Sequence, residues 1–116
     1  MPGGFGRATR PPGPARHERP AIDDAALVVA RHADRLLAAA REAGDRHWVA
    51  FLEPLPDRLR DDEVRGLRTT TARARAAFGS KDSIRDALPP ELTEPFLDSI
   101  DRLQRVLARA ALDRDA

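Results

Sequence analysis

The side chains with the most chemical potential in this sequence are three histidines, nineteen carboxylates and nineteen arginines. The histidines are His17, His32 and His47, and no two of them have the spacing of a His-x-x-x-His metal motif. Because the chain contains no cysteine, thiolate zinc ligands, disulfides and cysteine nucleophiles are excluded. We therefore expect no metal site.

Sequence signatures of catalysis are missing as well. There is no Gly-x-Ser-x-Gly elbow, no Walker glycine loop and no dinucleotide-binding glycine fingerprint. The carboxylates alternate with arginines, as at Asp57, Arg58, Arg60 and Asp61, which is typical of solvated helix faces with weak ion pairs. We predict that the protein is not an enzyme, with no catalytic residues and no cofactor.

Positive charge is distributed unevenly along a chain whose formal net charge is only +1. Near neutrality argues against a dominant polyanion-binding role, and the codon usage of a GC-rich genome is the simpler explanation for so many arginines. The first twenty residues nevertheless hold four arginines, and six more cluster in the middle. Of the central group, Arg65, Arg68 and Arg75 are candidates to share one exposed helix face.

Residues 1–20 are expected to form a disordered tail. They contain five prolines, four glycines and a single aromatic residue, Phe5. Such a segment cannot propagate a helix or bury enough apolar surface to offset the entropy of ordering. The remainder, residues 21–116, is predicted to be one helical domain.

Apolar residues at helical spacing predict the first helix of that domain. Its N-cap is expected at Asp23 or Asp24, and Gly44 is placed to end it in the left-handed conformation. Asp45 is a candidate N-cap for a second helix. Pro54 and Pro56 then interrupt the second pattern, so this helix must stop or kink there and restart a few residues later.

Two further helices complete the predicted fold. The acidic run 61–63 suits the positive end of a third helix, which Gly79 is expected to end. A last helix should begin near Thr93, with Pro95 tolerated in its first turn. The sequence thus predicts an all-α bundle of about four helices, one kinked or broken at Pro54/Pro56. Its expected core anchors are Trp48, Phe51, Phe78 and Phe96.

Four short segments carry a family resemblance: Asp45-Arg46-His47-Trp48, Phe51-Leu52, Ala77-Phe78-Gly79 and Ser83-Ile84-x-Asp86. Through them, residues 36–107 resemble an uncharacterised family of short bacterial helical proteins. The resemblance implies a compact helical fold with a glycine-containing connection. The family has no established activity that the resemblance could suggest for this chain. The chain departs from the family at Ser80, Lys81 and Asp82, where glycine and methionine are usual, and at Arg85, where asparagine is usual.

The segment around Gly79 has two interpretations. In the structural one, Gly79 ends a helix and Ser80 or Ser83 caps the next, with Asp86 in its first turn. In the functional one, Gly79, Ser80, Ser83 and exposed amides form a small pocket for an anion or a partner. The structural interpretation accounts for every residue of the segment, so it is preferred.

These observations favour a small non-catalytic protein-interaction or regulatory module. Its partner is another protein or a second copy of the chain, since the apolar stripe of the last helix suits either an internal core or an interface. The alternative is a weak nucleic-acid-binding protein that uses the basic tail and the central arginines. No secretory signal is seen, and the longest apolar run, residues 25–30, is far shorter than the roughly 20 residues that span a bilayer. A cytoplasmic location without a membrane partner is expected.

Overall fold

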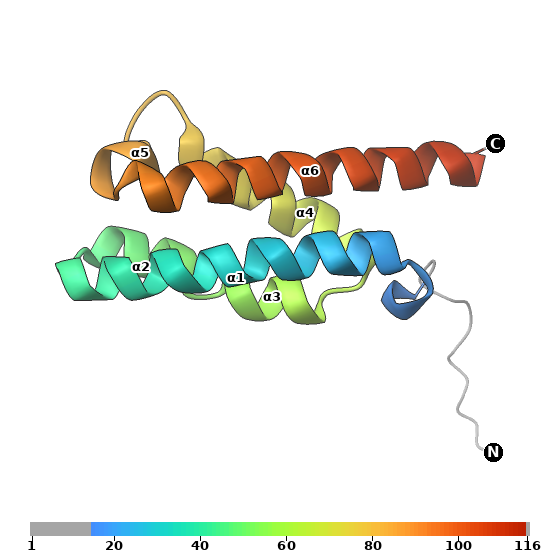
Figure 1. The fold of residues 1–116 in the computed structure, drawn as a ribbon, viewed down its shortest axis with the longest axis horizontal. Helices are drawn as coiled ribbons and strands as arrows, with labels where there is room; N and C mark the ends of the chain where they lie inside the picture. The colour runs from blue at the N-terminus through green and yellow to red at the C-terminus, as the bar shows by residue number, and fades with distance from the viewer. Residues whose placement is uncertain (1–14, 116) are drawn as a thin grey trace, which may run out of the picture.

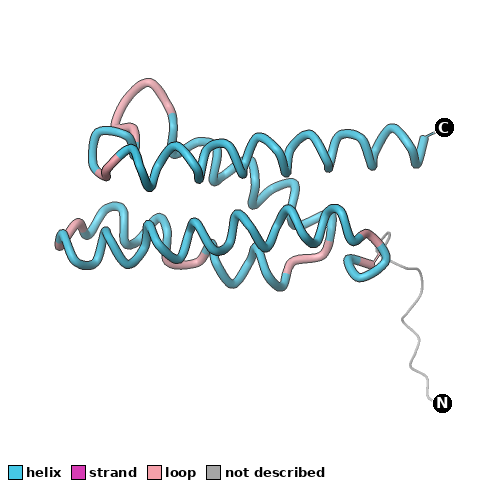
Figure 2. Tube along the Cα trace, in the orientation of Figure 1, coloured by secondary structure: helices cyan, strands magenta, loops and turns pink. Residues whose placement is uncertain are grey.

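The computed structural model describes residues 15–115, and the side chains of residues 15–112. Residues 1–14 of the predicted tail lie outside the described residues. All regular structure in the described part of the chain is helical, as Figure 2 shows, which confirms the all-α fold. The elements are η1 (Arg16–Glu18), α1 (Pro20–Ala43), α2 (Arg46–Leu52), α3 (Leu55–Asp61), α4 (Val64–Arg75), η2 (Ala76–Phe78), α5 (Ile84–Ala87) and α6 (Pro90–Asp115), where η is a 3-10 turn.

Two long helices, α1 and α6, form the frame of the molecule. They run antiparallel and side by side (Figure 1), and α1 also packs against α2 and α3. The short helices α4 and α5 pack against α6, and α3 contacts α4 to close the bundle. The predicted set of about four helices corresponds to α1, the broken pair α2 and α3, α4 and α6.

The break between α2 and α3 lies at the predicted prolines. Pro54 is the N-cap of α3 and Pro56 lies in its first turn, where the missing backbone donor costs no helical hydrogen bond. Asp45 caps α2, its carboxylate accepting the backbone N–H of Trp48 at 3.2 Å. Gly44 ends α1 with φ of +70°, the left-handed conformation predicted for it.

The starts of the two long helices differ from the prediction. α1 begins at Pro20, not at Asp23 or Asp24, and α6 begins at Pro90, not near Thr93. Proline suits the first helical position because its φ is already helical and no donor is needed there. As a result Pro95 lies inside α6, beyond its first turn.

The predicted tail ends at residue 20, and its last residues, 15–20, are described by the structure as η1 and the start of α1. Arg16 is buried in η1, and its Nε donates to Asp23 at 2.8 Å. Its Nη1 donates to the carbonyl of Asp62 at 2.9 Å, and its backbone N–H to Glu63 at 3.0 Å. One arginine therefore ties η1 to α1 and to the connection between α3 and α4.

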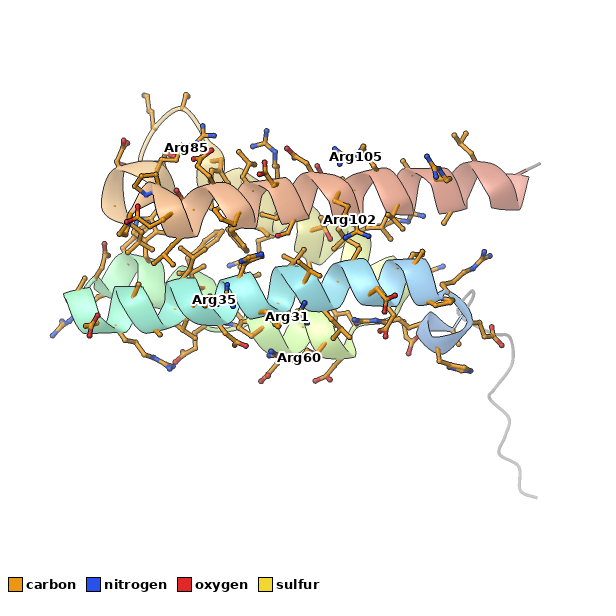
Figure 3. The ribbon with its side chains drawn as sticks, in the orientation of Figure 1. Arg31, Arg35, Arg60, Arg85, Arg102 and Arg105 are labelled. Carbon is orange, nitrogen blue, oxygen red and sulfur yellow. The ribbon has the colours of Figure 1, made fainter. Side chains whose placement is uncertain are left out.

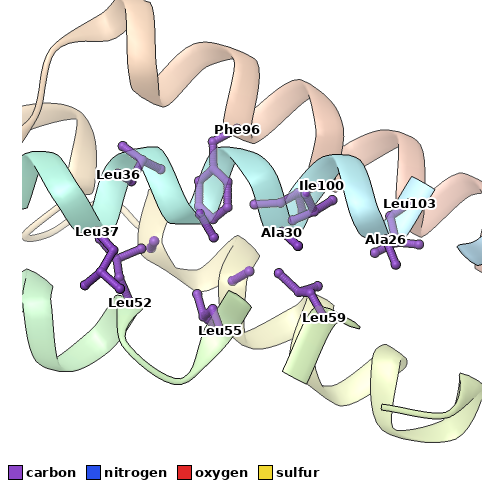
Figure 4. Close-up of a cluster of buried hydrophobic side chains, with 14 of the residues drawn as sticks. Ala26, Ala30, Leu36, Leu37, Leu52, Leu55, Leu59, Phe96, Ile100 and Leu103 are labelled. Carbon is purple, nitrogen blue, oxygen red and sulfur yellow. The ribbon is translucent and has the colours of Figure 1, made fainter. Parts of the chain in front are cut away.

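The core lies between α1, α3 and α6 (Figure 4). It is built mainly from aliphatic side chains, and its fully buried large members include Leu36, Leu52, Leu55, Leu59, Leu67, Phe96, Ile100 and Leu103. Trp48 is buried as predicted, whereas Phe51 and Phe78 are only half-buried and pack against the edge of the core. The stripe of α6 packs internally. None of the described helices is both long and apolar enough to cross a membrane.

Candidate functional site

The arginines predicted to share a face of α4 do not form a free cationic surface. Arg65 is exposed and has no ion pair with a described residue. Arg68 is half-buried and donates to the carbonyl of Leu107 at 3.1 Å, while Arg75 pairs with Asp101 at 3.2 Å. Two of the three thus turn towards α6 and help to hold α4 against it.

Two other central arginines also contact neighbouring helices. Arg60 pairs with Asp34 of α1 at 2.5 Å, and the guanidinium of Arg73 lies over the ring of Phe51 at 5.8 Å. Arg58 is exposed and makes no such contact with a described residue. The central cluster therefore serves mostly to connect helices, which leaves little of it for phosphate contacts.

Of the residues predicted for an anion pocket, Ser83 lines a pocket next to α5, and Gly79 and Ser80 are not part of its lining. Gly79 and Ser80 lie in an exposed connection, and Ser83 caps α5 by accepting the backbone N–H of Arg85 at 3.2 Å. Ser83 does line a pocket, but three aspartates line it as well. Their negative charge opposes an anion there.

A different cationic surface, which sequence reasoning missed, lies on the two long helices. We call it the arginine face and define it as Arg31 and Arg35 of α1 with Arg102, Arg105 and Arg109 of α6. All five side chains are exposed, and none has a salt bridge or hydrogen bond with a described residue. Figure 3 labels four of them, Arg31 and Arg35 on α1 and Arg102 and Arg105 on the neighbouring helix α6.

Helical spacing brings these arginines together. Arg31 and Arg35 are one turn apart, as are Arg102 and Arg105, and Arg109 follows one turn later. Exposed carboxylates on the same sides of the two helices are Asp24, Glu42, Glu91 and Asp98, each without an ion pair to a described residue. Asp98 lies one turn from Arg102, and the other three lie at least two turns along their own helix from the nearest of the five arginines, so positive charge exceeds negative charge only immediately around the arginines.

The pKa of His32 reflects the positive charge of the neighbouring arginines. It is half-buried on α1, next to Arg31 and one turn from Arg35. Its pKa is lowered from the ordinary value of 6.5, first by burial and then by the positive charges of Arg35 and Arg31. The arginines thus make this part of the surface unfavourable for a further positive charge.

Apolar hollows interrupt the arginine face. One, of about 280 Å³, is lined by Val106 with Arg102, Arg105 and Arg109. A second, of about 260 Å³, lies between the start of α1 and the end of α6. Its lining includes the apolar side chains of Ile22, Val106 and Ala110 and the charged side chains of Glu18, Arg19 and Arg109. A partner on this face would meet both charge and apolar surface.

A separate pocket of about 430 Å³ lies between the start of α2 and α5. We call it the Trp48 pocket; its lining residues are Asp45, His47, Trp48, Asp82, Ser83, Asp86 and Ala87. Two of the segments that carry the family resemblance thus meet here, although they are separated by more than thirty residues of sequence. The ring of His47 packs edge-on against Trp48, with centroids 4.8 Å apart.

An ion pair attaches α5 to α6. Arg85 donates from Nε and Nη2 to both carboxylate oxygens of Glu94, at 2.8 and 3.1 Å, and its guanidinium lies over the ring of Phe78. This pairing with Arg85 is the main reason why the pKa of Glu94 lies below its ordinary value. The carboxylates of Asp82 and Asp86, in contrast, have no ion pair with a described residue.

Comparison with known proteins gives no relative from which a role could be inferred. No family model matches the chain, and neither a curated protein nor a solved structure matches it. Among the described residues, no three histidine, aspartate or glutamate side chains are grouped so as to hold a metal ion.

Proposed function

We propose that this protein is a small non-catalytic interaction module whose arginine face binds an acidic region of another protein. The observation that carries the proposal is the set of five exposed arginines on α1 and α6, none of which has an ion pair with a described residue. Arginine is favoured at protein interfaces because its planar guanidinium forms two parallel hydrogen bonds to one carboxylate. Unpaired arginines are also free to form such bonds without first breaking an internal ion pair.

The apolar hollows favour a protein partner over a nucleic acid. Interfaces between proteins combine apolar anchors with arginines, and the half-buried Val106 supplies apolar surface beside Arg102 and Arg109. Nucleic acids are held mainly through phosphates or through bases stacked on aromatic rings. The arginine face contains no aromatic residue apart from the half-buried imidazole of His32.

Nucleic-acid binding is the alternative, and the same face supports it in part. Five arginines on two adjacent helices, with the basic N-terminal segment added, supply positive charge for phosphates. This alternative requires affinity that falls steeply with salt, because each phosphate contact releases a condensed counterion. Binding of a folded protein partner through apolar anchors should depend less on salt.

Affinity capture with two matched double variants tests the proposal. Arg35→Glu with Arg102→Glu reverses two charges on the arginine face. Arg58→Glu with Arg65→Glu reverses two exposed, unpaired charges on α3 and α4, so the net charge changes equally. Each form of the full chain is incubated with cell lysate, with and without nuclease, and the captured material is identified.

The expected result is one protein that survives nuclease treatment and is lost only with the Arg35/Arg102 variant. Equal loss with both variants would show nonspecific charge attraction and contradict the proposal. Loss of all captured material after nuclease treatment would favour the nucleic-acid alternative. Capture of nothing by the unmodified chain would contradict the interaction module itself.

The proposal also includes the location of this interaction, which is the bacterial cytoplasm. The resemblance to short bacterial helical proteins suggests a bacterial module, and a chain without cysteine is compatible with the reducing cytoplasm. Fractionation of cells that express the full chain would check the location. Recovery mainly in the membrane fraction would contradict a cytoplasmic role.

A further inference from the structure

Two helices packed side by side leave a groove along their line of contact, and α1 and α6 are packed in this way (Figure 1). The hollow of about 260 Å³ marks one end of that line, because Ala21 of α1 and Val106 of α6 both line it. Ala21, Val28 and Arg35 are spaced by seven residues and so share one side of α1. On α6, Arg102 and Arg109 lie one turn before and one turn after Val106. We call the line bordered by these residues the α1–α6 groove.

The α1–α6 groove is open and combines apolar with cationic side chains. Val28 and Val106 are half-buried, so part of each is left uncovered by the described fold. Among the described residues, four arginines and a single acid, Glu18, line the two hollows at Val106; the arginines are Arg19, Arg102, Arg105 and Arg109. An occupant with apolar anchors and negative charge complements this composition.

The dimensions of the groove favour a chain segment over a small molecule. Its two hollows, of about 280 and 260 Å³, are smaller than the roughly 300 to 1,000 Å³ of small-molecule sites, and each suits a single side chain. From Ala21 to Arg35 the groove is about 21 Å long, which equals about four turns of a partner helix.

The backbone of the two walls favours a helical occupant over an extended one. Both walls are α-helices, whose backbone N–H and C=O groups are already paired along their length. An extended segment would therefore find no backbone partners, whereas a helix satisfies its own and needs only side-chain contacts.

We propose that the α1–α6 groove binds an acidic amphipathic helix of another protein. This inference rests on the proposed function and names the kind of partner that the arginine face binds. Apolar residues of the partner helix, one turn apart, lie on Val28 and Val106, and its carboxylates pair with Arg35, Arg102 and Arg109. The apolar stripes of α1, α4 and α6 are buried in the protein's own core, so these helices do not supply the occupant from a second copy.

A designed peptide tests the inference without knowledge of the natural partner. The probe is a fluorescently labelled peptide of about 21 residues, with leucines at helical spacing on one face and glutamates beside them. One control peptide has the same composition with the leucines spread around the helix, and a second has lysine in place of every glutamate. Fluorescence anisotropy with the full chain should give saturable binding of the probe with a Kd below about 100 μM, at least about tenfold weaker binding of the first control, and none of the second.

The walls of the groove are tested with Val28→Thr and Val106→Thr, which keep the branched shape but make the surface polar. We expect each to weaken binding of the probe by about fivefold. Val49→Thr, the same change at a half-buried valine of α2, is the matched control and should leave binding unaltered. Thermal unfolding of the three variants shows whether they are equally folded, and the comparison of peptides needs no variant.

The possible failures separate this inference from the proposed function. Equal binding of the probe and the spread-leucine peptide, or undiminished binding by both valine variants, would overturn the helix in the groove and leave the arginine face as an acidic-protein site. Undiminished binding by Arg35→Glu with Arg102→Glu, or no saturable binding of any acidic peptide, would contradict both. A dimer of the full chain that the probe dissociates, as seen by sedimentation, would assign the groove to a second copy and overturn the inference.

Discussion

At the scale of single residues, Arg16 contributes more than its place near the chain end would indicate. Its side chain is 7% exposed and contacts both Asp23 and the carbonyl of Asp62. Burial of an arginine is costly unless its charge is paired and its donors are used. In Arg16, Nε and Nη1 donate to these partners, whereas the enclosed Nη2 has no hydrogen-bond partner among the described residues. Asp23 is only seven residues away, but the second partner lies at residue 62, and no local pattern around Arg16 indicates it.

Replacement of Arg16 by alanine should therefore destabilise the domain. We expect the free energy of unfolding to fall by about 3 kcal/mol, because Asp23 loses its partner and η1 loses its attachment. Urea denaturation followed by circular dichroism measures this change. Arg58→Ala, which removes an exposed arginine without an ion pair, should change stability by less than about 0.5 kcal/mol. Similar values for the two variants would contradict the role assigned to Arg16.

Trp48 is the second residue with a large expected effect. It is buried and contacts His47 and Phe51, so Trp48→Ala should cost about 3 to 5 kcal/mol of stability. Trp48→Phe should cost less, because it retains an aromatic ring. A denaturant midpoint that does not change in the alanine variant would remove Trp48 from the core.

His32 should make stability depend on pH. Its pKa in the folded protein is below 6.5, so below that pH the unfolded chain takes up a proton more readily than the folded one. Stability should consequently fall as the pH is lowered from about 7 through 6.5 and below. Denaturation at several pH values should show this slope, and His32→Gln should flatten it. An equal slope in the glutamine variant would assign the effect to other groups.

At the scale of elements, periodicity predicted the longer helices α1, α4 and α6, while proline determined where α1, α3 and α6 begin. The stripes of α1, α4 and α6 were visible in the sequence, as were the cap at Asp45 and the break at Pro54. The acidic residues Asp23 and Asp24 suggested an N-cap, but Pro20 begins α1 and leaves them in its first turns. Pro20 and the acidic pair Asp23 and Asp24 are both signals for the start of a helix. The helix begins at Pro20, because proline is suited to the first helical position.

Gly44 provides a test at this scale. Its φ is +70°, and a Cβ added there would meet no atom within 4 Å. The cost of Gly44→Ala is therefore purely conformational, and we expect about 1 to 2 kcal/mol from thermal or urea unfolding. Gly44→Asn should cost less, since asparagine adopts the left-handed conformation more readily. An alanine variant as stable as the original would show that the α1 to α2 turn does not require this conformation.

At the scale of the whole molecule, the sequence predicted neither proposed surface. Arg31 and Arg35 were visible at helical spacing, as were Arg102 and Arg105, but each pair resembled any solvated helix face. Only the side-by-side packing of α1 and α6 joins the pairs (Figure 3). The central arginines, which looked more promising in sequence, are mostly used between helices, as Arg60 is with Asp34.

The central claim is that an acidic chain binds the arginine face, and the imidazole of His32 can report on it. The most direct measurement is an NMR pH titration of His32 in the full protein, with and without poly-L-glutamate, with His47 as an internal reference outside the face. Bound carboxylates should counteract the charges of Arg35 and Arg31, so the account predicts that the pKa of His32 rises when the acidic polymer is added. The same pKa of His32 with and without saturating polymer would contradict the account.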